Sequence, residues 1–147
     1  MENNIFRKLE IFREDRGLDK NQFDMETYLR KDFEEMFELM GFEDDRCKAI
    51  AKEKAAKMFS LWKKAKEKGM CPKYSPFNKI DALGDRVVYA IEGIEQHGYN
   101  AEIVMDEIQK EINSRNGEII DGKFEKFKTD EAKAKWYKAN FHNALRI

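Results

Sequence analysis

Three glutamates with helical spacing are the first residues of this 147-residue chain that could carry chemistry. Glu34, Glu35 and Glu38 stand three and four positions apart, so a helix would place their carboxylates on one face. Like charges this close repel each other unless water or a cation relieves them. Because the apolar side chains of the same stretch point the other way, periodicity alone favours a solvated acidic face over a metal site.

A second acidic pair, Asp81 and Asp85, lies one helical turn apart within an apolar stretch. Aspartate is unfavourable inside a helix because its side chain competes for backbone hydrogen bonds. A position in the first turn would explain Asp81 without a function, but it would not explain Asp85. For this pair the residues alone leave a structural and a functional origin open.

Carboxylate oxygens are ligands that suit Mg²⁺ or Mn²⁺ better than Zn²⁺. The five carboxylates together therefore predict a site for hydrolysis of a phosphoanhydride, where a metal ion neutralises phosphate charge and activates water. Motifs of other chemistries are missing, since the sequence contains no Walker A loop, GxGxxG, HExxH or GxSxG.

Basic and aromatic side chains are interleaved between residues 114 and 128. Arg115, Lys123 and Lys126 could bind phosphates, and a neighbouring aromatic ring could stack on a base. The alternative is a solvated arm that docks Phe124 and Phe127 on the core. Taken by themselves, these residues favour the solvated arm.

The elements that must position these side chains are predicted to be helices, because helix-forming residues dominate and the chain has only 8 Gly and 2 Pro. A single all-α domain is expected from the length. Periodicity and end signals predict helices from Ile5 to near Gly17, over 24–40, 44–68 and 77–97, from an Asn100 cap past Ile112, and over 130–145. Turn dipeptides at 116–117 and 121–122 predict a short hairpin or an extended arm.

Apolar positions on these helices define the expected core. They are Leu29, Phe33, Met36, Phe37 and Met40 in the second helix, Ile50, Met58, Leu61 and Trp62 in the third, and Ile80, Leu83, Val87, Ile91 and Ile94 in the fourth.

Charge and composition exclude several classes of protein. A net charge of −1 gives no overall electrostatic basis for binding nucleic acid or an anionic membrane. No apolar run approaches the ~18 residues of a membrane span, and the polar N-terminus does not resemble a signal peptide. Cys47 and Cys71 are far apart and are expected to be free thiols, as in a cytoplasmic protein.

The order of the motifs resembles the MazG-like, all-α nucleoside triphosphate pyrophosphohydrolases, particularly small stand-alone members found in phages. The matching stretches are residues 12–18, 34–39, 81–88, 111–117 and 122–126. The resemblance implies a helical bundle completed as a homodimer or homotetramer in the host cytoplasm. It also implies Mg²⁺-dependent cleavage of a nucleoside triphosphate between the α- and β-phosphates, with Mn²⁺ as a substitute metal.

Carried onto this sequence, the resemblance assigns roles to the charged residues. It implies that Glu34 and Glu35 are catalytic, and it implies substrate contacts from a C-terminal arm over 114–147. The implied metal ligands are Glu35, Glu38, Asp81 and Asp85, and the implied substrate contacts are Arg115, Lys123 and Lys126.

The chain departs from the family pattern at two places. The family's glutamate three positions before the final aspartate is Ala82 here, so either Asp81 substitutes for it or the metal shell is changed. The helix over 44–68 separates the acidic motifs and is interpreted as an insertion. The tail over 135–138 resembles those of phage purine deoxynucleotide pyrophosphohydrolases, which suggests a purine deoxynucleotide substrate.

Two alternatives remain open. One is a non-enzymatic helical module whose acidic faces are solvated and whose segment over 114–138 contacts nucleic acid or a protein. The other is the same metal site acting on a different phosphoanhydride, such as phosphoribosyl-ATP.

Overall fold

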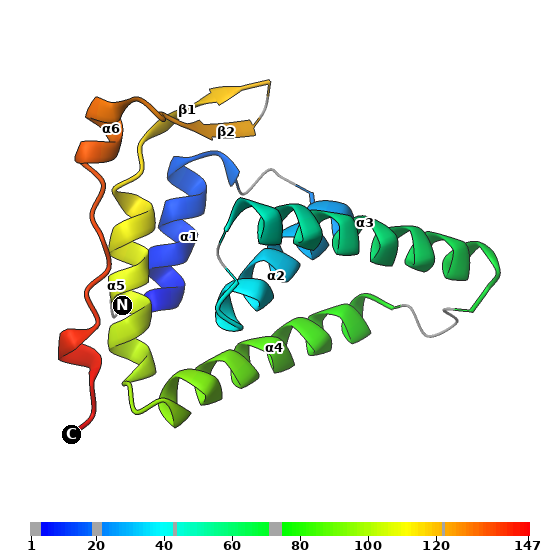
Figure 1. The fold of residues 1–147 in the computed structure, drawn as a ribbon, viewed down its shortest axis with the longest axis horizontal. Coiled ribbons are helices and arrows are strands. Elements are labelled where there is room, and N and C mark those ends of the chain that lie inside the picture. The colour runs from blue at the N-terminus through cyan, green and yellow to red at the C-terminus, as the bar shows by residue number, and fades with distance from the viewer. Residues whose placement is uncertain (1–3, 19–21, 43, 71–74, 122) are drawn as a thin grey trace. The chain divides into compact units, whose positions relative to one another are not determined.

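A computed structural model describes residues 4–18, 22–42, 44–70, 75–121 and 123–147, apart from the Lys123 side chain. The chain forms two compact units, one of residues 22–79 and one that combines residues 1–21 with residues 80–147. The structure is mainly helical and has one two-stranded antiparallel sheet, which confirms the expected all-α class in its main feature (Figure 1). Each unit is described by itself below.

The unit of residues 22–79 is built on two packed helices, α2 (Met25–Leu39) and α3 (Asp45–Glu67). Ala51 and Ala55 of α3 are its buried residues, and their small side chains allow two helices to approach closely. The predicted bounds of both helices are confirmed to within about one residue. The expected core positions are only partly covered, since Met36, Ile50 and Leu61 are exposed.

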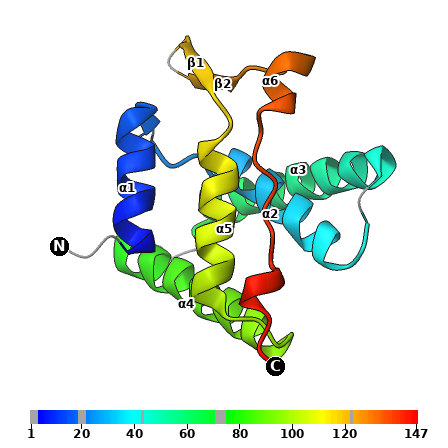
Figure 2. The same ribbon diagram turned by 90° about the vertical axis from the view of Figure 1, so that its left-hand side faces the viewer.

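The second unit contains α1 (Ile5–Asp15), which lies beside α5 (Ala101–Asn113) in both ribbon views (Figures 1 and 2). Lys8 Nζ and Asp106 Oδ1 form an ion pair of 2.9 Å across these helices. Ala101 and Val104 of α5 and Ala144 of the C-terminal segment are buried. The core of this unit is therefore small.

A short hairpin follows α5. It is one of the two alternatives that the turn dipeptides predicted, the other being an extended arm. Strands β1 (Gly117–Ile120) and β2 (Lys123–Lys126) are antiparallel, with Gly117 opposite Lys126 and Ile120 opposite Lys123. Arg16, after the end of α1, packs its guanidinium 4.1 Å from the Phe12 ring centroid and 5.2 Å from that of Phe124. The hairpin is thereby attached to the rest of its unit.

The expected last helix over 130–145 is wrong. The chain has one short helix, α6 (Asp130–Ala134), then an extended segment and a single 3₁₀ turn, η2 (His142–Ala144). The extended segment runs along α5, as Figure 2 shows. Side chains of α5 bind its backbone: Glu111 accepts from Ala139 N at 2.8 Å, and Glu107 accepts from Asn140 N at 3.0 Å. These bonds replace the helical ones.

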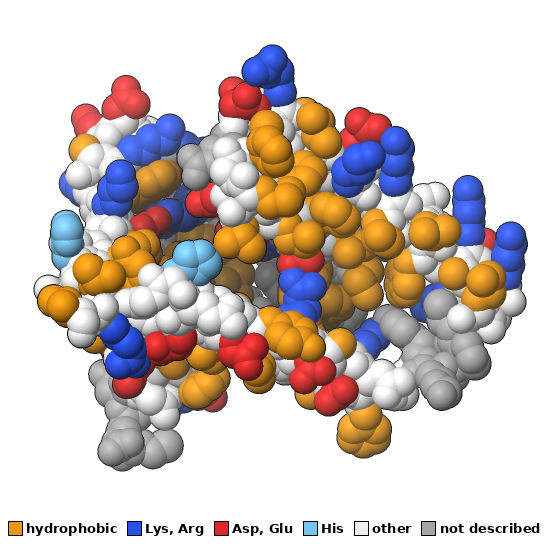
Figure 3. Space-filling view, turned by 60° about the horizontal axis from the view of Figure 1, so that its bottom comes forward, with side chains coloured by type: hydrophobic (Ala, Val, Ile, Leu, Met, Phe, Trp, Pro, Cys, Tyr) orange, Lys and Arg blue, Asp and Glu red, His pale blue; other side chains and the backbone are white. Residues whose placement is uncertain are grey.

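The prediction that the apolar stripe of α4 (Pro76–Gln96) is buried is also wrong for the single chain. Ile80, Val87 and Ile91 remain 68%, 53% and 42% exposed. Hydrophobic side chains are prominent at the surface in the face drawn in Figure 3. Periodicity identified side chains that share a face, but it could not show that this chain leaves the face uncovered.

Several local predictions are confirmed by the backbone. Gly17, Gly41, Gly69 and Gly98 have positive φ values of 64°, 87°, 69° and 86° at or just beyond helix ends. Asn100 caps α5, because its Oδ1 accepts from Ile103 N at 3.1 Å. Cys47 is a free thiol, whereas Cys71 lies outside the described residues.

Candidate functional site

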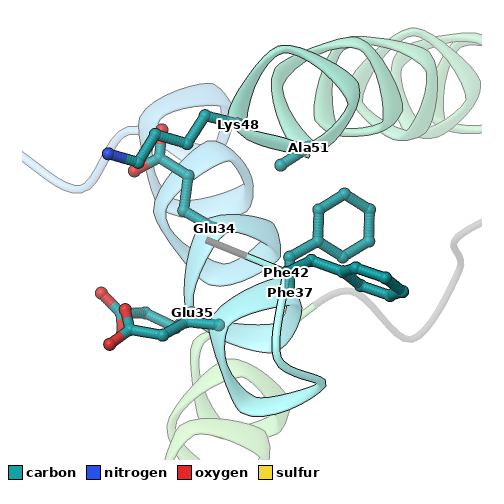
Figure 4. Close-up of a pocket in the computed structure, with 7 residues that line it drawn as sticks. Glu34, Glu35, Phe37, Phe42, Lys48 and Ala51 are labelled. Atoms are coloured by element: carbon teal, nitrogen blue, oxygen red, sulfur yellow. The ribbon is translucent and has the colours of Figure 1, made fainter. Parts of the chain in front are cut away.

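A cavity of about 300 Å³ lies on the α2–α3 pair. It brings together the three glutamates that the spacing singled out, and all of its lining comes from one unit. The lining residues are Glu34, Glu35, Phe37, Glu38, Phe42, Lys48 and Ala51 (Figure 4).

The turn between α2 and α3 shapes the apolar side of this cavity. Gly41, at a φ of 87°, lets Phe42 N donate to Phe37 O at 2.8 Å, which is a Schellman end for α2. The Phe37 and Phe42 rings then meet edge to face, with centroids 6.2 Å apart. Asp44 next caps α3 by accepting from Cys47 N at 2.9 Å. The sequence between the helices thus fixes where α3 begins.

The Glu35 carboxylate points away from the aromatic rings. Figure 4 shows Glu35 and the rings of Phe37 and Phe42 extending in opposite directions. Glu34 Oε1 is 3.2 Å from Arg30 Nη1, so this carboxylate already has a cationic partner. Glu35 and Glu38 are exposed, so the acidic face is accessible, and it also borders the cavity.

Negative charge in this cluster is incompletely compensated. The pKa of Glu35 is raised, first by partial desolvation and then by the nearby carboxylates of Glu38, Glu34 and Asp32. A raised pKa means that the ionised form is disfavoured where it stands. A cation bound among these oxygens would relieve the repulsion, and hard oxygen donors are what Mg²⁺ prefers.

Lys48 is a lining residue that sequence reasoning missed. It lies in the helix that the sequence analysis interpreted as an insertion, and its side chain lines the same cavity as the glutamates. Its position four residues after the Asp44 cap was the available signal, because it fixes Lys48 in the first turns of α3. An ammonium group beside carboxylates can hold the phosphate oxygens of a metal-bound ligand.

Asp81 and Asp85 lie on α4, in the unit that contains residues 80–147. Both are exposed, and their spacing places them on one face of the helix. Because α4 begins at Pro76, Asp81 lies beyond the first turn, and the helix dipole does not explain it. Within the described part of the chain, no group of three or more His, Cys, Asp or Glu is arranged to hold a metal ion.

The expected substrate contacts lie near the hairpin. Arg115 Nη2 is 2.5 Å from Glu111 Oε1, and its guanidinium carbon lies 5.4 Å from the Trp136 ring centroid. Lys126 Nζ lies 5.9 Å from the same centroid. The Lys123 side chain lies outside the described residues. The structure thus places Arg115 and Lys126 beside one aromatic ring, which no spacing rule indicated.

Comparison with family models, with curated proteins and with solved structures gives no match for this chain in any of the three. The resemblance to the MazG-like family therefore remains a hypothesis that rests on the motifs. Among the described helices, none is both long and apolar enough to cross a membrane.

Proposed function

We propose that this chain is a Mg²⁺-dependent nucleotide pyrophosphohydrolase, which converts a nucleoside or deoxynucleoside triphosphate to the monophosphate and pyrophosphate. The observation that carries the proposal is the cavity on α2 and α3, which Glu34, Glu35, Glu38 and Lys48 line together. The order of the motifs supplies the reaction class, and the tail over 135–138 makes purine deoxynucleotides the first substrates to test.

The metal ligands follow from the chemistry of the donors. Carboxylate oxygens fit Mg²⁺, so Glu35 and Glu38 are proposed as metal ligands, and the order of the motifs adds Asp81 and Asp85 of α4 to the proposal. When bound, Mg²⁺ neutralises phosphate charge and lowers the pKa of the attacking water.

The chain's own residues carry the rest of the reaction. A water oxygen attacks the α-phosphorus, the bond from that phosphorus to the bridging oxygen breaks, and pyrophosphate leaves. Glu34, held beside Arg30, accepts the proton that the water loses, with Glu35 as its neighbour. Lys48 attracts phosphate oxygens from the same cavity, and the proposed further substrate contacts are Arg115, Lys123 and Lys126. Catalysis of this kind depends mainly on positioning and charge.

The active form is proposed to be a homodimer or homotetramer. The apolar stripe of α4, with Ile80, Val87 and Ile91 exposed, is the surface that a second copy would cover. Burying such side chains stabilises by roughly 25 cal/mol per Å² of apolar surface. The same surface left in water would favour aggregation.

Three variants test the proposal against a matched control. Glu35→Gln, Glu38→Gln and Asp85→Asn should each reduce pyrophosphate release on the order of 100-fold while the protein stays folded. Glu53→Gln is the control, because Glu53 pairs with Lys57 on α3 at 2.8 Å and does not line the cavity. Equal activity in all four variants would remove the acidic residues from the mechanism.

A thermal-shift measurement separates the enzyme from a non-enzymatic binding module. The enzyme should be stabilised by Mg²⁺ plus a non-hydrolysable triphosphate, by about 2.7 kcal/mol at a ligand concentration 100 times its Kd. A binding module should show no such Mg²⁺-dependent gain, and its nucleic-acid binding should weaken as salt is added.

A further inference from the structure

A second cavity of about 300 Å³ lies in the C-terminal part of the chain, where α5 ends. Its lining belongs to one unit and includes two aromatic residues, an asparagine and two charged residues. The lining residues that matter for the argument are Ser114, Asn116, Phe127, Glu131, Lys135 and Trp136.

Some polar groups around this cavity already have hydrogen-bond partners within the protein, and others have none in the part of the chain that the structure describes. Ser114 Oγ donates to Glu111 O at 2.6 Å and accepts from Tyr137 N at 2.7 Å, so it serves the fold. Trp136 Nε1, in contrast, is buried and has no acceptor among the described residues. The Asn116 backbone carbonyl accepts from Phe127 N at 2.9 Å, and Asn116 is one of the lining residues. The Asn116 amide is therefore the lining group that we expect a ligand to meet.

Two cationic groups lie near the Trp136 ring, and the one on Arg115 is paired with Glu111. Arg115 and Lys126 place their cationic groups 5.4 and 5.9 Å from its centroid. The ring also lines the cavity, where Phe127 offers a second aromatic surface. Rings in such positions stack on planar ligands, and cations beside them favour a ligand that carries negative charge nearby.

From these contacts we infer that the cavity beside Trp136 binds the base of a mononucleotide. Its volume is at the lower end of small-molecule sites, ~300–1,000 Å³, which suits one planar ring system rather than a whole nucleoside triphosphate. The Asn116 amide and the charged groups of Glu131 and Lys135 offer both donors and acceptors to the edge of a base. The choice of a nucleotide rests on the proposed function, which the test below keeps separate.

The two tryptophans of the chain allow a direct measurement. In a Trp62→Phe variant, Trp136 is the only tryptophan, so its fluorescence reports this cavity. The variant is titrated with adenosine, guanosine, cytidine and uridine in the absence of Mg²⁺. Saturable quenching by a subset of these nucleosides is expected, because a base stacked on the ring changes its emission.

Asn116→Ala in the same background should weaken that binding about 3- to 10-fold, because this change removes one hydrogen bond to the base. Asn113→Ala is the matched control, since Asn113 does not line the cavity, and it should bind as the parent does. Quenching that is absent, or that does not saturate for any nucleoside, would overturn the inference. Tighter binding of a short single-stranded oligonucleotide than of every nucleoside would also overturn it.

Activity measurements keep this inference apart from the proposed function. Pyrophosphate release by a protein that shows no saturable nucleoside quenching would reject the base site alone. Saturable nucleoside binding without any hydrolysis would support the base site and reject the proposed function alone.

Discussion

Glu35 shows how the fold alters one carboxyl group. Desolvation and the surrounding carboxylates raise its pKa above the ordinary 4.5, so the folded chain binds this proton more tightly than the unfolded chain does. Ionisation therefore favours unfolding. The destabilisation is absent below the unfolded pKa, grows through the interval between the two pKa values, and is complete above the folded pKa.

Replacing this group with a neutral one should remove the effect. Without divalent metal, Glu35→Gln is expected to have a higher Tm than the wild type near neutral pH, and this advantage should shrink as the pH falls toward 4.5 and be absent well below it. Glu53→Gln should behave oppositely, because Lys57 lowers the pKa of Glu53. Melting curves across pH check both; a Glu35→Gln difference that is independent of pH would contradict the account.

Glu107 represents the opposite case. Hydrogen bonds from Lys110, from Tyr137 and from the Asn140 backbone lower its pKa to about 2. A lowered carboxyl pKa contributes stability above the unfolded value, and this stability is lost as the pH falls from about 4.5 to about 2. Glu107→Gln should thus lower Tm at neutral pH, and the deficit should narrow over that acidic range. A deficit of constant size would show that ionisation of Glu107 is not the cause.

At the scale of elements, the helix ends were the most predictable feature. Gly41 and Gly98 end helices because glycine adopts positive φ without steric cost, and Asn100 begins one because its side chain satisfies a free backbone amide. These signals act between residues that are close in sequence. They therefore needed no knowledge of the tertiary structure.

The C-terminal segment shows where such local reasoning fails. The spacing of Trp136, Tyr137 and Phe141 predicted a helix, but Glu107 and Glu111 of α5 bind the backbone of this segment in an extended form. The partners are about 30 residues apart in sequence, as with Tyr137 and Glu107, and no local pattern identifies them. Tertiary hydrogen bonds overrode helix propensity here.

The hairpin gives a prediction about one position. A Cβ at Gly117 would overlap the carbonyl group of Glu125 on the paired strand, so Gly117→Ala should destabilise the protein by about 1–3 kcal/mol. Gly93→Ala is the matched control within α4, where nothing lies within 4 Å of a new Cβ. That change should be neutral or stabilising by up to about 1 kcal/mol. Equal unfolding free energies for both variants would contradict the packing of the hairpin.

At the scale of the molecule, the uncovered face of α4 is the feature that the proposed oligomer explains. Val87→Glu puts a charge in the middle of that apolar stripe, and burying an unpaired charge costs several kcal/mol. In light scattering we expect this variant to have the mass of a monomer and the wild type to have the mass of the proposed dimer or tetramer.

Tyr89→Glu is the control for that experiment. Tyr89 is 68% exposed and lies across α4 from the stripe at 100° per residue, so its replacement should leave the oligomer intact. Dissociation by both variants to the same degree would indicate general destabilisation. A monomeric wild type would contradict the proposed assembly directly.

The candidate site was predictable only within one helix. Spacing showed that Glu34, Glu35 and Glu38 share a face, and they do line one cavity. Spacing could not show that Lys48 joins them, because that depends on how closely α3 packs on α2 at Ala51. It also could not find the cavity of Trp136, whose lining comes from the end of α5, the hairpin and α6.

The central claim is the reaction itself, and pyrophosphate release tests it most directly. The wild-type protein is incubated with a panel of nucleoside and deoxynucleoside triphosphates with Mg²⁺, with Mn²⁺ and with EDTA, and pyrophosphate and phosphate are measured separately. The account predicts pyrophosphate release from a subset of the panel that requires metal and stops with EDTA. No pyrophosphate from any member, with a protein shown to be folded and oligomeric, would contradict it.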